Sequence, residues 1–144
     1  MIDVKPVLLC LVAAALVSAC GKNETPTTPT TTTPPAAPTT TATFNGKLPV
    51  GGSSFYSFTI AQQGTVNITL VTVGGAGVPT DVTLGLGIGR PAGTGCSITT
   101  SVNVAAGTDP QLTGTYGPGV FCTLVADIGN LPAAATFTVT IAHP

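Results

Sequence analysis

The feature that most constrains the fold of this chain is a two-residue alternation of apolar and polar side chains within residues 43–144. A period of two, with many β-branched residues, is typical of strands that bury one face. No helical pattern of useful length appears in this part of the chain. The alternation is clearest in four stretches, whose apolar members would share one face: Tyr56, Phe58 and Ile60; Val66, Ile68 and Leu70; Val82, Leu84, Leu86 and Ile88; and Phe137, Val139 and Ile141.

Turn sequences rich in glycine, proline and asparagine separate these stretches. Weaker strands are expected near residues 43–48, 96–104, 111–116 and 120–126. About eight strands at this spacing predict an all-β fold: a single antiparallel β-sandwich that is jelly-roll-like. We therefore assign residues 43–144 to one β-sandwich domain.

The stretch LGLGIG at 84–89 has glycine at every second position, which does not match the G-x-G-x-x-G pattern of phosphate-binding loops. It fits a strand whose second face lacks side chains, so we expect another part of the chain to pack closely against that backbone. A ligand on the glycine face is the alternative. Phe55, which alternates with the core positions, is expected to be exposed.

Before the domain, an apolar run extends from Val7 to Ala19. It is too short to cross a bilayer, which takes about 20 residues, but it suits the apolar region of a secretory signal peptide. The run ends in Val17-Ser18-Ala19-Cys20, which resembles the lipobox of bacterial lipoproteins. The resemblance implies a signal peptide at 1–19, diacylglyceryl transfer to the Cys20 sulfur and acylation of the new amino terminus. An ordinary signal peptide with an incidental cysteine is the other interpretation.

Lipidated Cys20 would anchor the protein to the membrane lipid of a bacterial cell envelope, because two or three acyl chains bind a bilayer stably. Glycine at position 21, rather than aspartate, favours the outer membrane under the enterobacterial sorting rule. Residues 20–42 are nearly all threonine, proline and alanine. Such a segment has little to bury and is expected to form an extended, flexible linker, with O-glycosylation as a further use of its threonines.

Cys96 and Cys122 remain after Cys10 leaves with the signal peptide and Cys20 takes the lipid. In an oxidising envelope, two cysteines in a small β-domain are expected to form a disulfide. A metal or redox site is the alternative, although the sequence has no C-x-x-C spacing and only one histidine.

The order of several stretches is similar to that of the bacterial pre-peptidase C-terminal (PPC-like) domain. These stretches are FNGKLPVGGSSFYSFTI, TVNITL, DVTLGLGIG, GPGVFCTLVADIGN and TFTVTI. The resemblance covers nearly all of residues 43–144 and implies a β-sandwich accessory module, usually non-catalytic and often fused to exported enzymes. Some members of that family bind calcium through acidic loops, whereas this chain is poor in acids. We expect its module to stand alone on the tether, without an attached enzyme.

Few residues in the chain could support catalysis. The only histidine, His143, is the penultimate residue, where chains tend to fray, and no G-x-S-x-G motif occurs. Asp81, Asp109 and Asp127 stand beside turn residues, where an aspartate usually accepts hydrogen bonds from its own backbone. Asp81 and Asp127 are weak candidates for a calcium site, which needs six to eight oxygens. We expect no enzymatic activity, no cofactor and no catalytic residues.

The formal net charge of −1 and the low content of charged residues argue against nucleic acid as a partner, because nucleic-acid binding requires a basic surface. Two functional hypotheses remain. One is a non-catalytic, lipid-anchored envelope protein whose β-sandwich is an accessory module for a protein partner. The alternative is a module that binds a glycan or extracellular polymer, with or without calcium, which the lack of tryptophan weakens.

Overall fold

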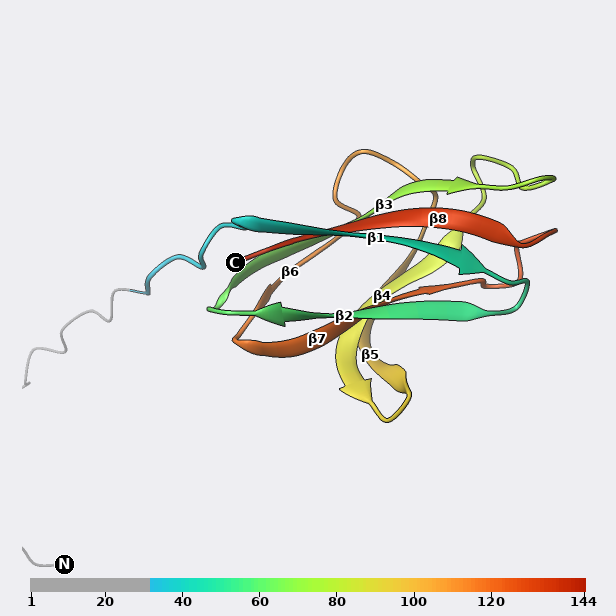
Figure 1. The fold of residues 1–144 in the computed structure, drawn as a ribbon. Coiled ribbons are helices and arrows are strands. Elements are labelled where there is room, and N and C mark those ends of the chain that lie inside the picture. Colours follow the sequence, from blue (N-terminus) through green and yellow to red (C-terminus); the bar gives the residue numbers. More distant parts are fainter. Residues whose placement is uncertain (1–31) are drawn as a thin grey trace, which may run out of the picture. The chain divides into compact units, whose positions relative to one another are not determined.

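The structure, a computed structural model, describes residues 32–144; the predicted signal peptide, Cys20 and much of the predicted linker lie outside the described residues. The described part confirms the all-β fold and the expected number of strands. No helix in residues 32–144 is long and apolar enough to cross a membrane. The chain forms eight strands (Figure 1): β1 (Thr40–Leu48), β2 (Ser53–Ile60), β3 (Gly64–Gly74), β4 (Leu84–Ala92), β5 (Gly95–Val104), β6 (Leu112–Tyr116), β7 (Gly119–Ala126) and β8 (Ala135–His143).

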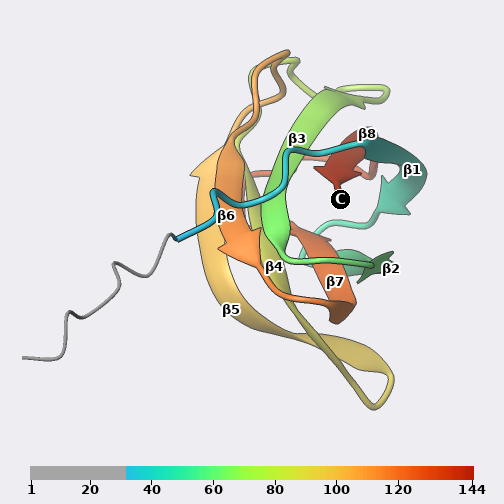
Figure 2. The same ribbon diagram turned by 90° about the vertical axis from the view of Figure 1, so that its left-hand side faces the viewer.

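The strands form two antiparallel four-stranded sheets, in the orders β1-β8-β3-β6 and β2-β7-β4-β5. Figure 2 shows the two sheets facing each other. β1 pairs with β8, β2 with β7, β3 with β6 and β4 with β5, so the first half of the domain pairs in reverse order with the second. One long antiparallel ribbon rolled into two facing sheets gives this order. The predicted jelly-roll sandwich is thus confirmed.

The core lies between the sheets and is built from the alternating apolar side chains. In β8, for example, Phe137, Val139 and Ile141 are buried, whereas the threonines between them face outward. The register of β3 against β8 places Leu70 opposite Val139 and Ile68 opposite Ile141, so the side chains meet as cross-strand pairs. Burial of each such side chain contributes roughly 1.5–3 kcal/mol relative to exposure.

The paired structure begins before residue 43, the start expected from composition. β1 begins at Thr40, which pairs with His143. Farther upstream, the Ala36 carbonyl accepts a hydrogen bond of 2.8 Å from the Thr65 N–H, forming an isolated bridge beside Gly64. Residues 36–42 have little to bury, but Ala36 bridges to β3 and residues 40–42 pair with β8. Composition alone could not reveal that pairing.

The expectation that His143 frays is wrong. Its side chain is buried, its ring lies 5.4 Å from the Phe58 ring between centroids, and its carbonyl accepts a hydrogen bond from the Thr39 N–H. Pairing with β1 therefore holds the C-terminal residues in the sheet.

The predicted disulfide is confirmed: Cys96 of β5 and Cys122 of β7 are bonded, with their Cα atoms 5.9 Å apart. Cys122 is opposite Gly89 of β4, so the bond ties the end of the β4–β5 hairpin to the neighbouring strand. Beside it, Arg90 donates a hydrogen bond to the Val120 carbonyl and its guanidinium carbon lies 3.8 Å from the centroid of the Phe121 ring. These contacts hold the hairpin against the sandwich.

Replacing both Cys96 and Cys122 by alanine is expected to lower the free energy of unfolding by roughly 3–4 kcal/mol, because the bond closes a loop of 26 residues. Denaturant titration of the oxidised protein and the double variant measures this difference. An unchanged unfolding midpoint would show that the bond contributes nothing to stability.

Candidate functional site

The strand directions place the connections between strands at two ends of the sandwich. The joining end holds Thr40, where β1 begins, the C-terminal residues and three turns of two or three residues, at 61–63, 93–94 and 117–118. The other end, here called the loop end, carries three longer connections, at 49–52, 75–83 and 127–134. A fourth, 105–111, runs from the end of β5 back along the middle of β3, where Gly107 and Gln111 donate hydrogen bonds to the Leu70 and Ile68 carbonyls. Binding residues are disproportionately found on longer loops held by a rigid scaffold. The loop end is therefore the first candidate surface.

Asp127 connects two of these loops. Its Oδ2 accepts a hydrogen bond of 2.7 Å from the Gly51 N–H, and its Oδ1 accepts three more from the N–H groups of Gly129, Asn130 and Leu131, at 2.9, 2.9 and 3.1 Å. These bonds, the one from Gly51 most strongly, hold the pKa of Asp127 below its usual value of 3.8, although partial desolvation opposes them. Gly51 has a φ of 68°, which a glycine adopts without strain.

Two amide side chains fix the remaining loops. Asn130 donates a hydrogen bond to the Thr83 carbonyl at 3.1 Å, which joins 127–134 to 75–83. The Gln111 side chain accepts from the Leu70 N–H at 2.7 Å and donates to the Leu70 and Ala105 carbonyls. It thus acts as an extra strand partner for β3 at the bulge after Leu70. The loop end is held by specific hydrogen bonds, so its surface is preorganised.

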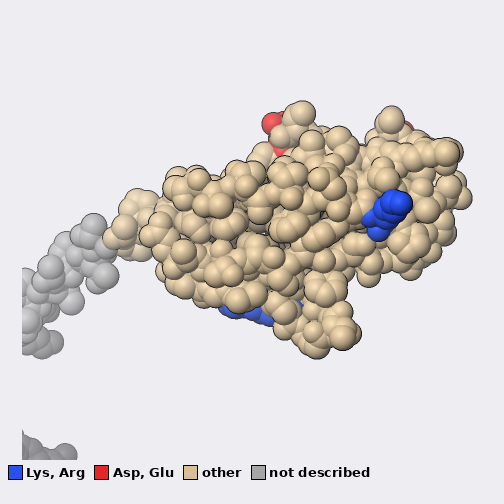
Figure 3. Space-filling model, viewed as in Figure 1, with Lys and Arg blue, Asp and Glu red and all other residues tan. Residues whose placement is uncertain are grey.

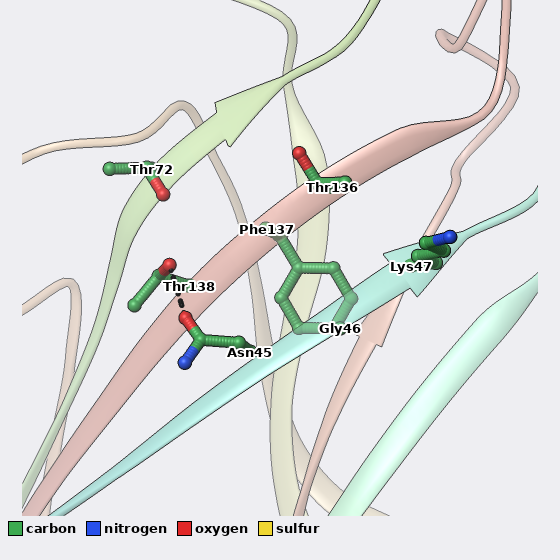
Figure 4. A pocket seen from close by; sticks show the side chains of 7 residues that line it. All are labelled: Asn45, Gly46, Lys47, Thr72, Thr136, Phe137 and Thr138. Atoms are coloured by element: carbon green, nitrogen blue, oxygen red, sulfur yellow. Dashed lines mark hydrogen bonds between the residues drawn. The ribbon is translucent and has the colours of Figure 1, made fainter.

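A polar depression of about 540 Å³ lies on the outer face of β1, β8 and β3 (Figure 4). The Thr138 hydroxyl donates a 2.7 Å hydrogen bond to Asn45 Oδ1, and no hydrogen bond within residues 32–144 uses the Asn45 amide N–H groups. Hydroxyl, amide and ammonium groups in this arrangement can hydrogen-bond to hydroxylated or anionic ligands. The residues that line the depression are Asn45, Gly46, Lys47, Thr72, Thr136, Phe137 and Thr138.

The face that contains this depression has few charged groups. Figure 3 shows charged side chains widely spaced over a surface that is otherwise uncharged. The outward positions of β8 and its neighbours are mainly threonines: Thr43 and Thr69 flank Thr140, and Thr72 lies opposite Thr138. Recognition there would depend on hydrogen bonds and shape rather than on long-range electrostatic attraction.

On the opposite sheet, the prediction of close packing against the glycine face of β4 is confirmed. A Cβ on Gly85 would lie 3.2 Å from Ile128, and one on Gly87 would lie 3.1 Å from Ile98. A smaller, mainly apolar groove of about 230 Å³ lies over these glycines, with Ser101 and Asn103 also in its lining. The neighbouring Phe55 is exposed, as expected from its position in the alternation.

The two calcium candidates differ in their surroundings. Asp81 is exposed, and four backbone N–H groups already use the two oxygens of Asp127. In residues 32–144, no three acidic, histidine or cysteine side chains form a group that could hold a metal ion. Asp127 therefore stabilises a turn by accepting hydrogen bonds from the backbone, as the turn residues beside it in the sequence indicated.

Sequence reasoning missed the polar depression. Its one visible signal was the run of threonines alternating with apolar residues in β8, which marks a polar outer face but not where that face is hollowed. Comparison with protein-family models and with curated proteins finds no match for this chain.

Asp127→Asn is expected to destabilise the domain, because the carboxamide NH₂ would replace one oxygen acceptor among four backbone donors. The lowered pKa means that the carboxylate stabilises fully above the unfolded value near 3.8 and loses this effect as the pH falls through the lower folded value. The difference in unfolding free energy between wild type and variant should therefore be full at about pH 7 and shrink toward about pH 2.

Denaturant titrations of Asp127→Asn at several pH values measure this difference. Asp81→Asn is the matched control, because Asp81 is exposed and its side chain makes no hydrogen bond within the described residues. Equal effects of the two substitutions, or a difference that does not change with pH, would contradict the role given to Asp127.

Proposed function

We propose that this protein is a non-catalytic, lipid-anchored protein of a bacterial cell envelope that presents its β-sandwich as an interaction module to a protein partner. The lipobox-like sequence ending at Cys20 supports the anchor, and the glycine that follows it supports the outer membrane. The threonine- and proline-rich segment supports a spacer between lipid and domain. The partner would be another envelope protein.

The observation that carries the proposal is the separation of the two ends of the sandwich. The chain enters the domain at the joining end, where Thr40 pairs with His143, whereas the longer loops lie at the other end. An anchor that precedes β1 thus leaves the loop end available for contacts. Val50 and Ile128 are exposed apolar side chains on two of those loops, and a partner docked there would bury them.

The placement of the reactive residues supports a binding role over a catalytic one. Cys96 and Cys122 are consumed in a disulfide, and the oxygens of Asp127 are occupied by backbone donors. His143 is buried at the joining end against Phe58, away from the polar depression. A general acid or base needs access to its substrate, which the buried His143 lacks.

The polar depression favours a second candidate function, the binding of a glycan or other hydroxylated polymer. Asn45, Lys47 and the threonines around them offer hydrogen-bond donors and acceptors on an open surface. The lining includes the edge of one aromatic side chain, Phe137, but that ring is almost fully buried and cannot stack on a sugar. For this reason the protein-binding proposal stands first.

A photo-crosslinking amino acid at Val50 in the full chain is expected to capture one reproducible envelope protein in intact cells. The same amino acid at Gln62, an exposed residue of the joining end, should not capture it. Electrophoresis and mass spectrometry of the crosslinked species measure the result. Capture from Gln62 but not Val50 would contradict the loop-end assignment. Polysaccharide without protein at Val50 would favour the second candidate.

A further inference from the structure

The two sheets have four edge strands, and two of these edges cover one another. β1 and β2 meet along one side of the sandwich: the Tyr56 hydroxyl donates to the Asn45 carbonyl, and the Ser54 hydroxyl donates to the Lys47 carbonyl, both at 3.0 Å. The rings of Phe44 and Tyr56 stack there, with centroids 4.6 Å apart. Covering edge groups in this way protects a sheet against pairing with another chain.

The other side of the sandwich lacks this protection. Its edges are β6, of 5 residues, and β5, of 10 residues. Within residues 32–144, no hydrogen bond joins β5 to β6, whereas hydroxyl groups bridge β1 and β2 on the opposite side. The β5 strand contains no charged residue and no proline, the side chains that commonly block edge pairing. A long, uncharged edge of this kind is a template for a further strand.

The part of β5 that is regular enough to pair is 100–104. Thr99 is the extra residue of a bulge, since Ile88 is opposite Thr100 and Gly89 is opposite Ile98. Beyond this bulge, Val102 and Val104 face the core but are only half-buried, because they lie at the open side of the sandwich. A strand added to this edge would cover both valines and satisfy the unpaired backbone groups.

A second copy of the same strand fits this edge. In an antiparallel two-fold pairing centred on Val102, Val102 meets Val102 of the other copy, Thr100 meets Val104, and Ser101 meets Asn103. Every pair then keeps its side chains on a common face, as antiparallel pairing requires. With the two-fold axis at Val102, all five residues of 100–104 are paired and the bulge at Thr99 lies outside the pairing.

We propose that β5 docks against β5 of a second copy of this chain, forming a two-fold dimer whose β2-β7-β4-β5 sheets join into one continuous sheet. A five-residue pairing is small compared with a standard stable interface. The dimer is therefore favoured where copies are concentrated, and its population in cells rests on the lipid anchor of the proposed function.

Disulfide crosslinking of the full chain in intact cells tests the dimer. Val102→Cys should give a disulfide-linked dimer on mild oxidation, because directly opposed residues have Cα atoms about 4.5–5.5 Å apart, within the range of a disulfide. Thr100→Cys is the matched control on the same strand and face. Its two copies would be about 13 Å apart, so it should not crosslink alone. Cells that produce Thr100→Cys and Val104→Cys together should form the mixed dimer.

The same variants are compared with Cys20 intact and with Cys20→Ser, so that the dimer and the anchor are tested separately. A Val102 crosslink that weakens severalfold in Cys20→Ser supports a dimer concentrated by the anchor. A crosslink of equal strength in both supports the dimer and counts against its dependence on the anchor. No crosslink from Val102→Cys with Cys20 intact, equal crosslinking from Thr100→Cys alone, or a crosslink to a different protein would overturn the proposal.

Discussion

The pairing of β1 with β8 is the interaction on which the rest of the arrangement depends. It joins the first and last strands of the domain in register from Thr40 to Leu48, and it makes β8 an interior strand whose Val139 and Ile141 are fully buried. It also places the entry of the chain beside its C-terminal residues. Since the strands are antiparallel, the loops 49–52, 75–83 and 127–134 must then lie at the opposite end.

Low charge density shapes how this domain satisfies its polar groups. Side chains pair with backbone groups at three places where the ladders stop: Tyr56 at the edge of β1, Gln111 at the bulge of β3 and Asp127 between two loops. No buried side-chain nitrogen or oxygen in residues 32–144 lacks a hydrogen-bond partner. The long edge of β5 has no comparable protection, and this contrast motivates the proposed dimer.

The fold could be predicted from the sequence because a period of two specifies which side chains face the core, whatever the partner strand. The close packing at Gly85 and Gly87 followed from the glycine spacing, whereas the Cys96–Cys122 bond followed from the two cysteines left over in an oxidising compartment. The start of β1 at Thr40 and the burial of His143 could not be predicted, because both depend on pairing between residues about a hundred positions apart. The polar depression was missed because it depends on how three strands curve together.

The measurement that tests the central functional claim most directly is metabolic labelling of the full chain with a palmitate analogue, followed by fractionation of the cell envelope. The account predicts that the wild-type protein carries the label and sediments with the outer membrane, whereas Cys20→Ser carries none and leaves the membrane fraction. Cys10→Ser, altered within the apolar run, should behave like wild type. An unlabelled wild-type protein, or label that persists in Cys20→Ser, would contradict a lipid-anchored module.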